Sequence, residues 1–266
     1  MSEFLGSAII WPLQLAALFS IFLLRALLIA GGSALWAERS LWAKSRQIIP
    51  AMLSRRKYAL EILQGAKVLL VDALVTILLI RAEVFQFAPL AGVWEFIVTF
   101  LLLFVWVEIF FYYSHRLFHW PRFFWIHRHH HQASPLNPWT SLSFSLVERL
   151  VLLAGVSVIP ALVSWWMPFP LEAYAAYFLF NYVLNVYGHL NVETVPPRFT
   201  GTRLGQVLNT STYHALHHLR YRGHYGLFTS TLDRFHGTKF SDYELKQKQS
   251  YERGVAVGAR AGRVEA

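Results

Sequence analysis

The chain has 266 residues, of which 55% are hydrophobic and only 15% are charged, and its formal net charge is +9. Soluble globular domains carry roughly 25% charged residues, so this composition indicates a membrane protein rather than an average soluble one. The absence of cysteine excludes disulfides, thiolate metal sites and iron–sulfur clusters. No nucleic-acid-binding motif accompanies the positive charge, which fits contact with anionic lipid heads instead.

Several apolar stretches are long enough to cross a bilayer, which takes about 20 residues. We expect spans at about 8–30, 68–90 and 92–113, followed by two more between about 147 and 189. The last two are separated by MPFP at 167–170, where proline cannot continue a helix and a tight helical hairpin can form. The sequence therefore predicts an all-α, multi-pass membrane bundle of about 4–5 spans.

The distribution of basic residues predicts the orientation, because cytoplasmic loops are enriched in Lys and Arg. Residues 31–67 carry seven bases against two acids, and the chain from 190 onward carries eleven against six, whereas the 165–172 turn has no base. We therefore expect the 31–67 loop, the 114–147 segment and the C-terminus on the cytoplasmic side. Within that loop, residues 38–66 alternate basic and apolar residues, which predicts an amphipathic helix on the inner membrane surface.

All twelve histidines lie between residues 115 and 236, at the predicted cytoplasmic face. The sequence H-x-x-H-H occurs at 127–131 and again at 214–218, and residues three or four apart share one face of a helix. Together with H-x-x-x-H at 115–119 and one histidine after the last span, these motifs offer nine imidazoles. They are His115, His119, His127, His130, His131, His189, His214, His217 and His218. Because one metal takes about four to six ligands, nine nitrogens indicate two metals.

These motifs resemble the fatty acid hydroxylase/sterol desaturase superfamily of integral-membrane, histidine-rich di-iron oxygenases. The matching segments are EIFFYYSHRLFH (108–119), WIHRHHHQASP (125–135), NVYGHLN (185–191) and STYHALHHLRYRGHYGLFTSTLDRFHGT (211–238). The resemblance implies a membrane bundle capped by a cytoplasmic histidine-rich di-metal domain, with the nine histidines as ligands to two iron ions. It also implies O2-dependent hydroxylation or desaturation of a lipid such as a fatty acyl chain or sterol. Electrons would come from a separate donor of the reductase, cytochrome or ferredoxin type.

The resemblance covers roughly residues 100–240, so we divide the chain into three parts. Residues 1–95 hold the N-terminal spans and the basic loop, 96–240 form the hydroxylase-like catalytic domain, and 241–266 form a polar tail. This tail has no clear apolar periodicity from about residue 244, and we expect it to be partly disordered.

A few polar residues near the motifs could complete a metal's ligands. Asn191 and Glu193 stand where some members of the superfamily have a tenth histidine. Either that ligand is absent from this chain, or Asn191, Glu193 or a water takes its place. His224 could support a ligand or be simply polar. His129 sits at the variable position of its motif and is left out of the ligand set.

Other polar residues could orient the ligands or line a path for the substrate. Metal-bound imidazoles usually donate their other N–H to a carboxylate or carbonyl, and Glu108 and Asp233 are the carboxylates we expect in that role. Asn181 and Asn185 precede His189 at four-residue steps. They could line a route toward the metals, with hydrogen bonding between helices as an equal alternative.

Two other functions use metal-binding histidines in a membrane. A divalent-metal transporter would place its ligands near the bilayer midplane, whereas these histidines gather after the spans end. A zinc-dependent membrane hydrolase would need a general base such as the glutamate of H-E-x-x-H, and the chain has no such motif. Both alternatives are disfavoured relative to the oxygenase.

Overall fold

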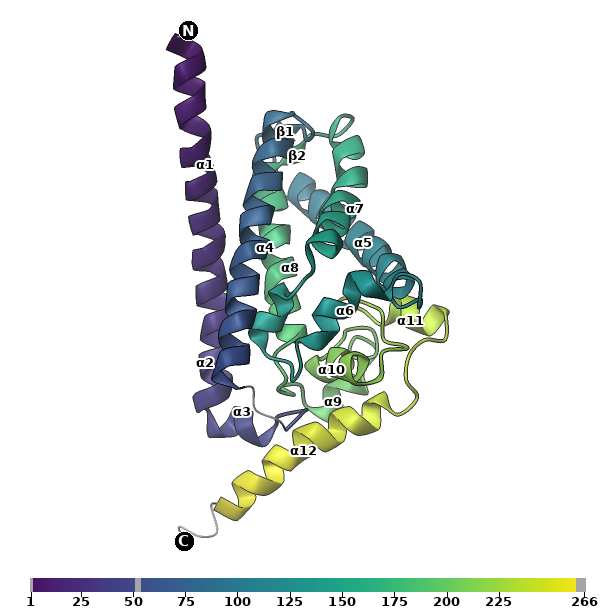
Figure 1. Cartoon of the computed structure of the whole chain (residues 1–266). Coiled ribbons are helices and arrows are strands. Elements are labelled where there is room, and N and C mark those ends of the chain that lie inside the picture. The colour runs from purple at the N-terminus through teal and green to yellow at the C-terminus, as the bar shows by residue number, and fades with distance from the viewer. Residues whose placement is uncertain (1, 51–53, 262–266) are drawn as a thin grey trace.

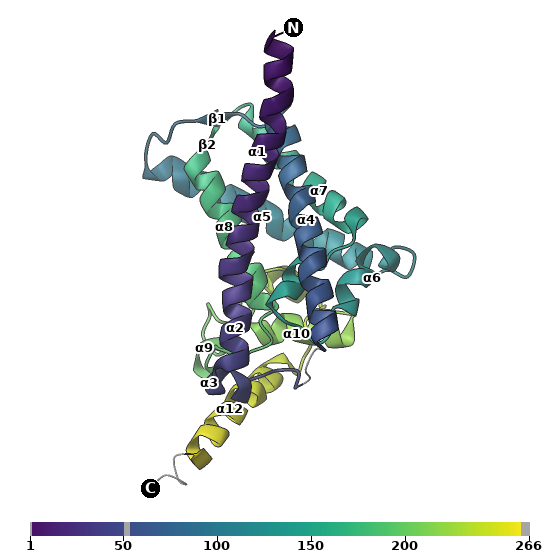
Figure 2. The same ribbon diagram turned by 60° about the vertical axis from the view of Figure 1, so that its left-hand side comes forward.

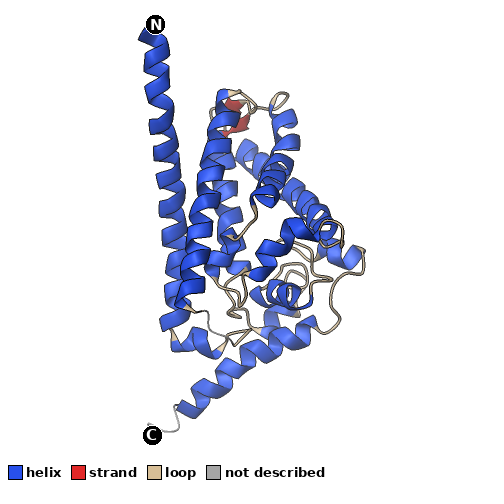
Figure 3. Cartoon of the chain, viewed as in Figure 1, coloured by secondary structure: helices blue, strands red, loops and turns tan. Residues whose placement is uncertain are grey.

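The computed structural model describes residues 2–50 and 54–261, which are mostly helical (Figure 3). The long helices are α1 (Ser2–Ala26), α4 (Arg55–Arg81), α5 (Val93–Phe118), α7 (Leu146–Ser164), α8 (Leu171–Gly188) and α12 (Tyr243–Ala261). A π-helical turn, η1 (Leu27–Gly31), joins α1 to α2 (Gly32–Arg39), and a 3-10 helix, η2 (Pro138–Leu142), precedes α7. The shorter helices are α3 (Leu41–Ser45), α6 (Phe124–Gln132), α9 (Pro197–Thr200), α10 (Ser211–Arg220) and α11 (Thr231–Phe235).

Within residues 2–50 and 54–261, four helical segments are long and apolar enough to cross a membrane. They are Ile10–Arg39, which runs through α1, η1 and α2, together with α4, α5 and α7. This supports an integral membrane protein and confirms the predicted all-α, multi-pass class. The fifth expected span, α8, carries Glu172, Asn181 and Asn185, and it is not among the four. It lies beside α5 and returns the chain to the end of the bundle where α5 finishes (Figure 1).

The second span begins earlier than the sequence predicts. We expect it from about residue 68, whereas α4 starts at Arg55, where the hydroxyl of Ser54 accepts a hydrogen bond from the Lys57 amide. Such a side-chain cap fixes the start of a helix. The predicted surface helix over 38–66 is therefore wrong, because α4 takes up its second half. Tyr58 and Ile62, which gave the apolar periodicity, pack against the buried core.

The bundle has two different ends (Figures 1 and 2). At one end, strands β1 (Phe87–Ala88) and β2 (Phe169–Pro170) form a short parallel pair, with Phe87 opposite Phe169. At the other end lie α3, α6, α10 and α12. The basic loop, the histidine motifs and the C-terminal helix therefore share one end of the molecule.

The C-terminal segment is helical as far as the structure describes it, whereas residues 262–266 of the predicted flexible tail lie outside the described residues. Residues Tyr243–Ala261 form the helix α12, which crosses the histidine end and packs against α3, α9 and α10. The side chain of Gln247 is fully buried and donates to the carbonyl of Val195 at 2.5 Å. The guanidinium of Arg46 stacks on the ring of Tyr251 at 4.8 Å. These contacts supply the packing that is not apparent from the polar sequence of the segment.

Candidate metal centre

The nine histidines of the motifs come together in two adjacent groups, within each of which the potential ligand atoms lie within 4.8 Å of one another. One group has five members, His115, His119, His127, His131 and His217. The other has four, His130, His189, His214 and His218. Eight of the nine are buried, and only His119 is partly exposed.

Each H-x-x-H-H helix contributes to both groups. In α6, His127 and His131 are four residues apart and join the five-histidine group, while His130 joins the four-histidine group. In α10, the pair four residues apart, His214 and His218, joins the four-histidine group instead. Both helices therefore lie between the two groups. The pair of histidines four residues apart belongs to the five-histidine group in α6 and to the four-histidine group in α10.

The Nε2 atoms converge at distances suited to a shared ion. The Nε2 of His115 lies 3.1 Å from that of His127, and the Nε2 of His189 lies 2.9 Å from that of His214 and 3.2 Å from that of His130. The Nε2 of His218 lies 3.1 Å from that of His130. Two nitrogens bound about 2.1 Å from one ion at a right angle are roughly 3.0 Å apart. The spacing within each group therefore matches a metal's coordination sphere.

The opposite ring nitrogens show why a cation fits between these atoms. The Nδ1–H of His115 donates to the carbonyl of Tyr225 at 2.9 Å, and that of His217 donates to the carbonyl of Gly223 at 2.8 Å. His189 donates in the same way to the carbonyl of Asn185 at 2.8 Å, and His130 to that of Ser143 at 3.3 Å. A neutral imidazole with its proton on Nδ1 has only a lone pair on Nε2. The facing lone pairs repel one another unless a positive charge lies between them.

Glu148 is a functional residue that the sequence reasoning did not identify. Its carboxylate accepts the Nδ1–H of His127, and both side chains are buried. Glu148 lies in the first turn of α7, where the hydroxyl of Ser145 accepts from its amide and begins the helix. A carboxylate at the edge of an apolar span is costly without a partner. Its position at the start of an apolar stretch is therefore the sequence signal that could have identified Glu148.

Burial keeps the imidazoles in their neutral, ligating form. It lowers the pKa of His131 to about 3 and that of His189 to about 4. Burial first, and the neighbouring histidines second, lower the pKa values of five other members well below the usual value, namely His127, His130, His214, His217 and His218. A neutral ring is the form that binds a metal, so the site is ready to bind at neutral pH without losing protons from these rings.

Glu108 and Asp233 were expected to accept hydrogen bonds from the imidazoles, but neither contacts an imidazole of the two groups in this way. Each binds the loop between α10 and α11 instead of a ligand. Glu108 accepts from the amides of Phe228 and Thr229 at 2.9 and 3.0 Å. Asp233 accepts from the amides of Tyr225 and Gly226 at 2.9 and 2.7 Å. Since this loop carries the carbonyls that receive His115 and His217, the two carboxylates position these two imidazoles through the backbone.

Asn191, Glu193 and His224 lie outside both histidine groups. The side chain of Asn191 pairs with the backbone of Ile49 at 2.8 and 3.1 Å. Glu193 accepts from the hydroxyl of Thr210 at 2.7 Å, just before α10 begins. His224 stacks on the ring of Tyr213 at 3.6 Å and donates to its carbonyl. The polar atoms of Asn191 and Glu193 and the Nδ1 of His224 bind the protein itself, whereas the buried Nε2 of His224 has no partner among the described residues.

The asparagines of α8 have different surroundings. Asn181 donates to the hydroxyl of Tyr177 at 3.3 Å, within its own helix. Asn185 reaches the site only through its backbone carbonyl, which receives His189. Their place on a substrate path stays a prediction. His129, which is not in the predicted ligand set, is exposed and lies outside both groups.

A cavity of about 360 Å³ opens beside the five-histidine group, and His119 forms part of its wall. Phe124, Tyr221 and Arg222 form other parts of the wall. The ring of Tyr221 also stacks on His131 at 4.6 Å, and its backbone has a positive φ of 67°. The cavity therefore lies at the edge of the site, against the partly exposed His119.

Comparison with known proteins agrees with this geometry. A family model described as fatty acid hydroxylase matches residues 100–238, just over half of the chain. The very-long-chain aldehyde decarbonylase CER1 of Arabidopsis thaliana is 28% identical over 56% of this chain and 24% of its own length. The very-long-chain aldehyde decarbonylase GL1-4 of Oryza sativa subsp. indica is 31% identical over 55% of this chain and 25% of its own.

Fatty acid hydroxylase domain-containing protein 2 of Macaca fascicularis is 29% identical over 56% of this chain and 40% of its own length. The chain thus spans about a quarter of the plant relatives and two fifths of the macaque protein. No solved structure matches it. The matched region contains every histidine of the two groups, and by this match the chain belongs to the fatty acid hydroxylase family.

Proposed function

We propose that the protein is a membrane-bound non-haem iron oxygenase that uses O2 and an external electron donor to oxidise a long-chain lipid. The observation that carries the proposal is the facing of Nε2 atoms at 2.9–3.2 Å in two groups. Oxygen acceptors hold the opposite ring nitrogens of His115, His127, His130, His189 and His217. Imidazole suits iron, and two irons bound here would supply activation of O2. The family membership supports iron over zinc for these ligands.

The chain's own residues would hold and shield this centre. Glu148 orients His127 and makes it a stronger ligand, because a carboxylate partner increases the basicity of the ring. The carbonyls of Tyr225 and Gly223 do the same for His115 and His217 with less charge. Burial of both groups excludes water from the reacting positions. The cavity beside His119 is the route by which O2 would enter.

The names of the relatives widen the choice of substrate. The sequence alone suggests a fatty acyl chain or a sterol, whereas two of the relatives are named very-long-chain aldehyde decarbonylases. A long-chain aldehyde is therefore a second candidate substrate. Incubating the iron-loaded protein with acyl lipids and with aldehydes separates these possibilities. Hydroxylation or desaturation would keep the carbon count, while decarbonylation would shorten the product by one carbon.

Metal analysis of the purified full chain tests the proposal directly. We expect about two irons per chain when iron is supplied during expression, counted by mass spectrometry. A variant with His127→Ala and His217→Ala removes two members of the five-histidine group and should lose metal. His129→Ala is the matched control, because this exposed histidine of the same helix lies outside both groups. A folded protein with zinc alone, insensitive to iron supply, would contradict the proposal.

We further propose that the histidine end faces the cytoplasm, because it carries the basic 31–67 segment and the C-terminal helix. The chain has no cysteine, so single cysteines report sidedness without background. Gln249→Cys places one on α12, and Ala91→Cys places one in the loop before α5 at the opposite end. In intact cells, an impermeant thiol reagent should label Ala91→Cys alone. The reverse labelling would overturn this orientation.

A further inference from the structure

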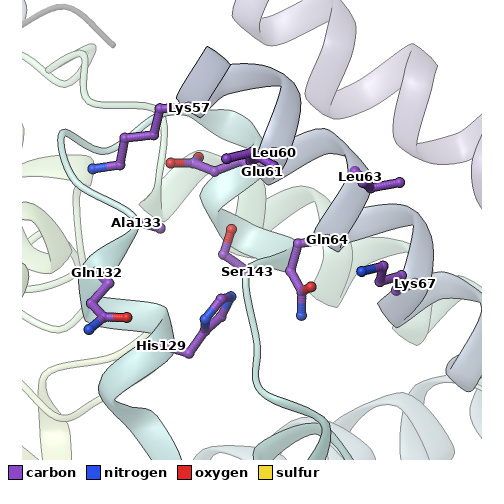
Figure 4. Close-up of a pocket in the computed structure, with 10 residues that line it drawn as sticks. All are labelled: Lys57, Leu60, Glu61, Leu63, Gln64, Lys67, His129, Gln132, Ala133 and Ser143. Carbon is purple, nitrogen blue, oxygen red and sulfur yellow. The ribbon is translucent and has the colours of Figure 1, made fainter. Parts of the chain in front are cut away.

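A second cavity, of about 310 Å³, lies between α4 and the end of α6 and is separate from the one beside His119 (Figure 4). One wall comes from the first half of α4, from Lys57 to Lys67. The other comes from the end of α6 and from Ser143, in the segment between η2 and α7. Since α4 begins at the histidine end of the bundle, the cavity lies near the level where a span leaves the membrane.

Two buried polar atoms of this cavity have no hydrogen-bond partner among the described residues, Ser143 Oγ and Glu61 Oε1. Ser143 is 1% exposed and Glu61 is 6% exposed. The other carboxylate oxygen of Glu61 is satisfied, since it accepts from Asn137 at 2.6 Å and from Thr140 at 3.2 Å. A buried polar group without a partner is costly, so two in one cavity indicate a ligand that supplies a donor.

The charge and polarity around these atoms limit the class of ligand. Lys67, exposed on α4, provides a cation at one side of the cavity, and Lys57 provides a second, whose ammonium donates to the carbonyl of Ser134. Leu60 and Leu63 of the same helix are 55% and 54% exposed and form an apolar strip beside the cavity. The cavity therefore suits the polar head of an amphiphile whose chains run along α4. Basic pockets between helices at the membrane surface bind phosphate-bearing lipid heads in this way.

We infer that this cavity binds the headgroup of a phospholipid, with the phosphate near Lys67 and a hydrogen-bond donor of the headgroup at Glu61 and Ser143. The donor is an ammonium N–H or a hydroxyl, because Glu61 Oε1 only accepts when ionised. Ser143 also links the cavity to the metal centre, since its backbone carbonyl receives the Nδ1–H of His130. Ser143 alone would thus separate the lipid headgroup from His130, a proposed metal ligand. The inference does not depend on the oxygenase activity.

Native mass spectrometry of the full chain in detergent tests this inference. The protein is exchanged into phosphatidylethanolamine, phosphatidylglycerol or phosphatidylcholine, and separately into glycerol phosphate. We expect retention of one phosphatidylethanolamine or phosphatidylglycerol, and several-fold weaker retention of phosphatidylcholine, whose quaternary ammonium has no N–H. Glycerol phosphate, which has the phosphate and the donor without chains, should not be retained.

Two variants separate the site from general lipid contact. Lys67→Gln should weaken retention about fivefold, whereas Lys44→Gln, an exposed lysine of α3 outside the cavity, should leave it unchanged. Ser143→Ala removes no bond made by the protein, because Ser143 Oγ has no partner among the described residues. It should therefore keep the melting temperature of the lipid-free protein and lose most of the stabilisation by added phosphatidylglycerol.

Three results would overturn the inference. Equal retention of all three phospholipids with no effect of Lys67→Gln would mean contact with annular lipid only. Retention of glycerol phosphate as strong as that of the lipids would mean a site for a soluble phosphate compound. No retained lipid would mean that water alone fills the cavity and satisfies Ser143 and Glu61.

Discussion

Replacing Glu148 by glutamine should weaken one metal position more than the other. The substitution keeps the shape of the side chain and removes the charge that faces the Nδ1–H of His127. A hydrogen bond to a charged group contributes about 1.5–3 kcal/mol, against about 0.5–1.5 kcal/mol for a neutral pair. The difference of about 1–1.5 kcal/mol corresponds to roughly a tenfold loss of metal affinity. Loss of such a partner generally costs about 10–100-fold, which agrees.

The assay is stepwise removal of metal by a chelator from iron-loaded protein, followed by counting metal per chain. His127 belongs to the five-histidine group only, so Glu148→Gln should release that group's ion at about tenfold lower chelator strength. The other ion should stay, giving a plateau near one metal per chain. Glu172→Gln is the matched control, because Glu172 lies in the first turn of α8 and is exposed. Loss of both ions in one step, or curves that overlap with those of the unchanged protein, would refute the reasoning.

Two further changes should alter stability, and a third should alter iron content. Burial lowers the pKa of His131 to about 3 and that of His189 to about 4, so the metal-free folded state binds fewer protons than the unfolded state below pH 6.5. The free energy of unfolding should be highest above that pH. It should fall by about 1.4 kcal/mol per pH unit for each histidine as the pH drops toward 4. Denaturant unfolding at a series of pH values measures this change. Asp72→Asn leaves Arg149 without its buried partner, which binds it at 2.6 and 2.7 Å, and should cost about 3 kcal/mol in thermal unfolding. Gly226→Ala puts a Cβ 2.1 Å from the backbone carbonyl of residue 229, so the loop that receives His115 must shift, and the iron content should fall.

Each of these predictions has a control and a contradicting outcome. Asp242→Asn removes an exposed pair with Arg220 and should cost less than about 1 kcal/mol; an equal cost for Asp72→Asn would contradict the buried-pair argument. Gly32→Ala adds a Cβ with nothing within 4 Å, so it should keep the iron content. If the metal-free protein is equally stable at pH 5 and pH 7.5, its histidines take up protons at pH 5 as readily in the folded state as in the unfolded state. That result would contradict the lowered pKa values.

The sequence predicted four of its five expected spans and the grouping of the histidines, because each depends on a local pattern. The apolar runs and the spacing in H-x-x-H-H determine which residues share a helix face, and all nine histidines come together as that pattern requires. The supporting residues depend on long-range packing instead. Glu148 is 21 residues from His127, and Glu108 is 120 residues from Phe228. The residues next to a buried carboxylate in the sequence do not indicate which distant group it contacts, so these pairs could not be predicted.

The boundary of α4 shows a different limit. The first residues of α4 carry charges that resemble those of a surface helix, so the sequence placed them in an amphipathic segment. In the structure, α4 continues through them because Ser54 begins the helix and Glu61 finds buried partners in Asn137 and Thr140. A polar residue inside a span is predictable only when its partner is known.

The loop between α10 and α11 is synthesised well after the histidine of α5 whose ring donates to it. His115 and the carbonyl of Tyr225 that receives it are 110 residues apart. At roughly 5–20 residues per second, the ribosome needs about 6–22 seconds to add that stretch. During this interval the histidines of α5 and α6 exist without the partners that α10 and the following loop supply. Imidazole binds copper more tightly than iron. Correct metal content would therefore depend on the speed of translation and on the supply of iron, as well as on the finished site.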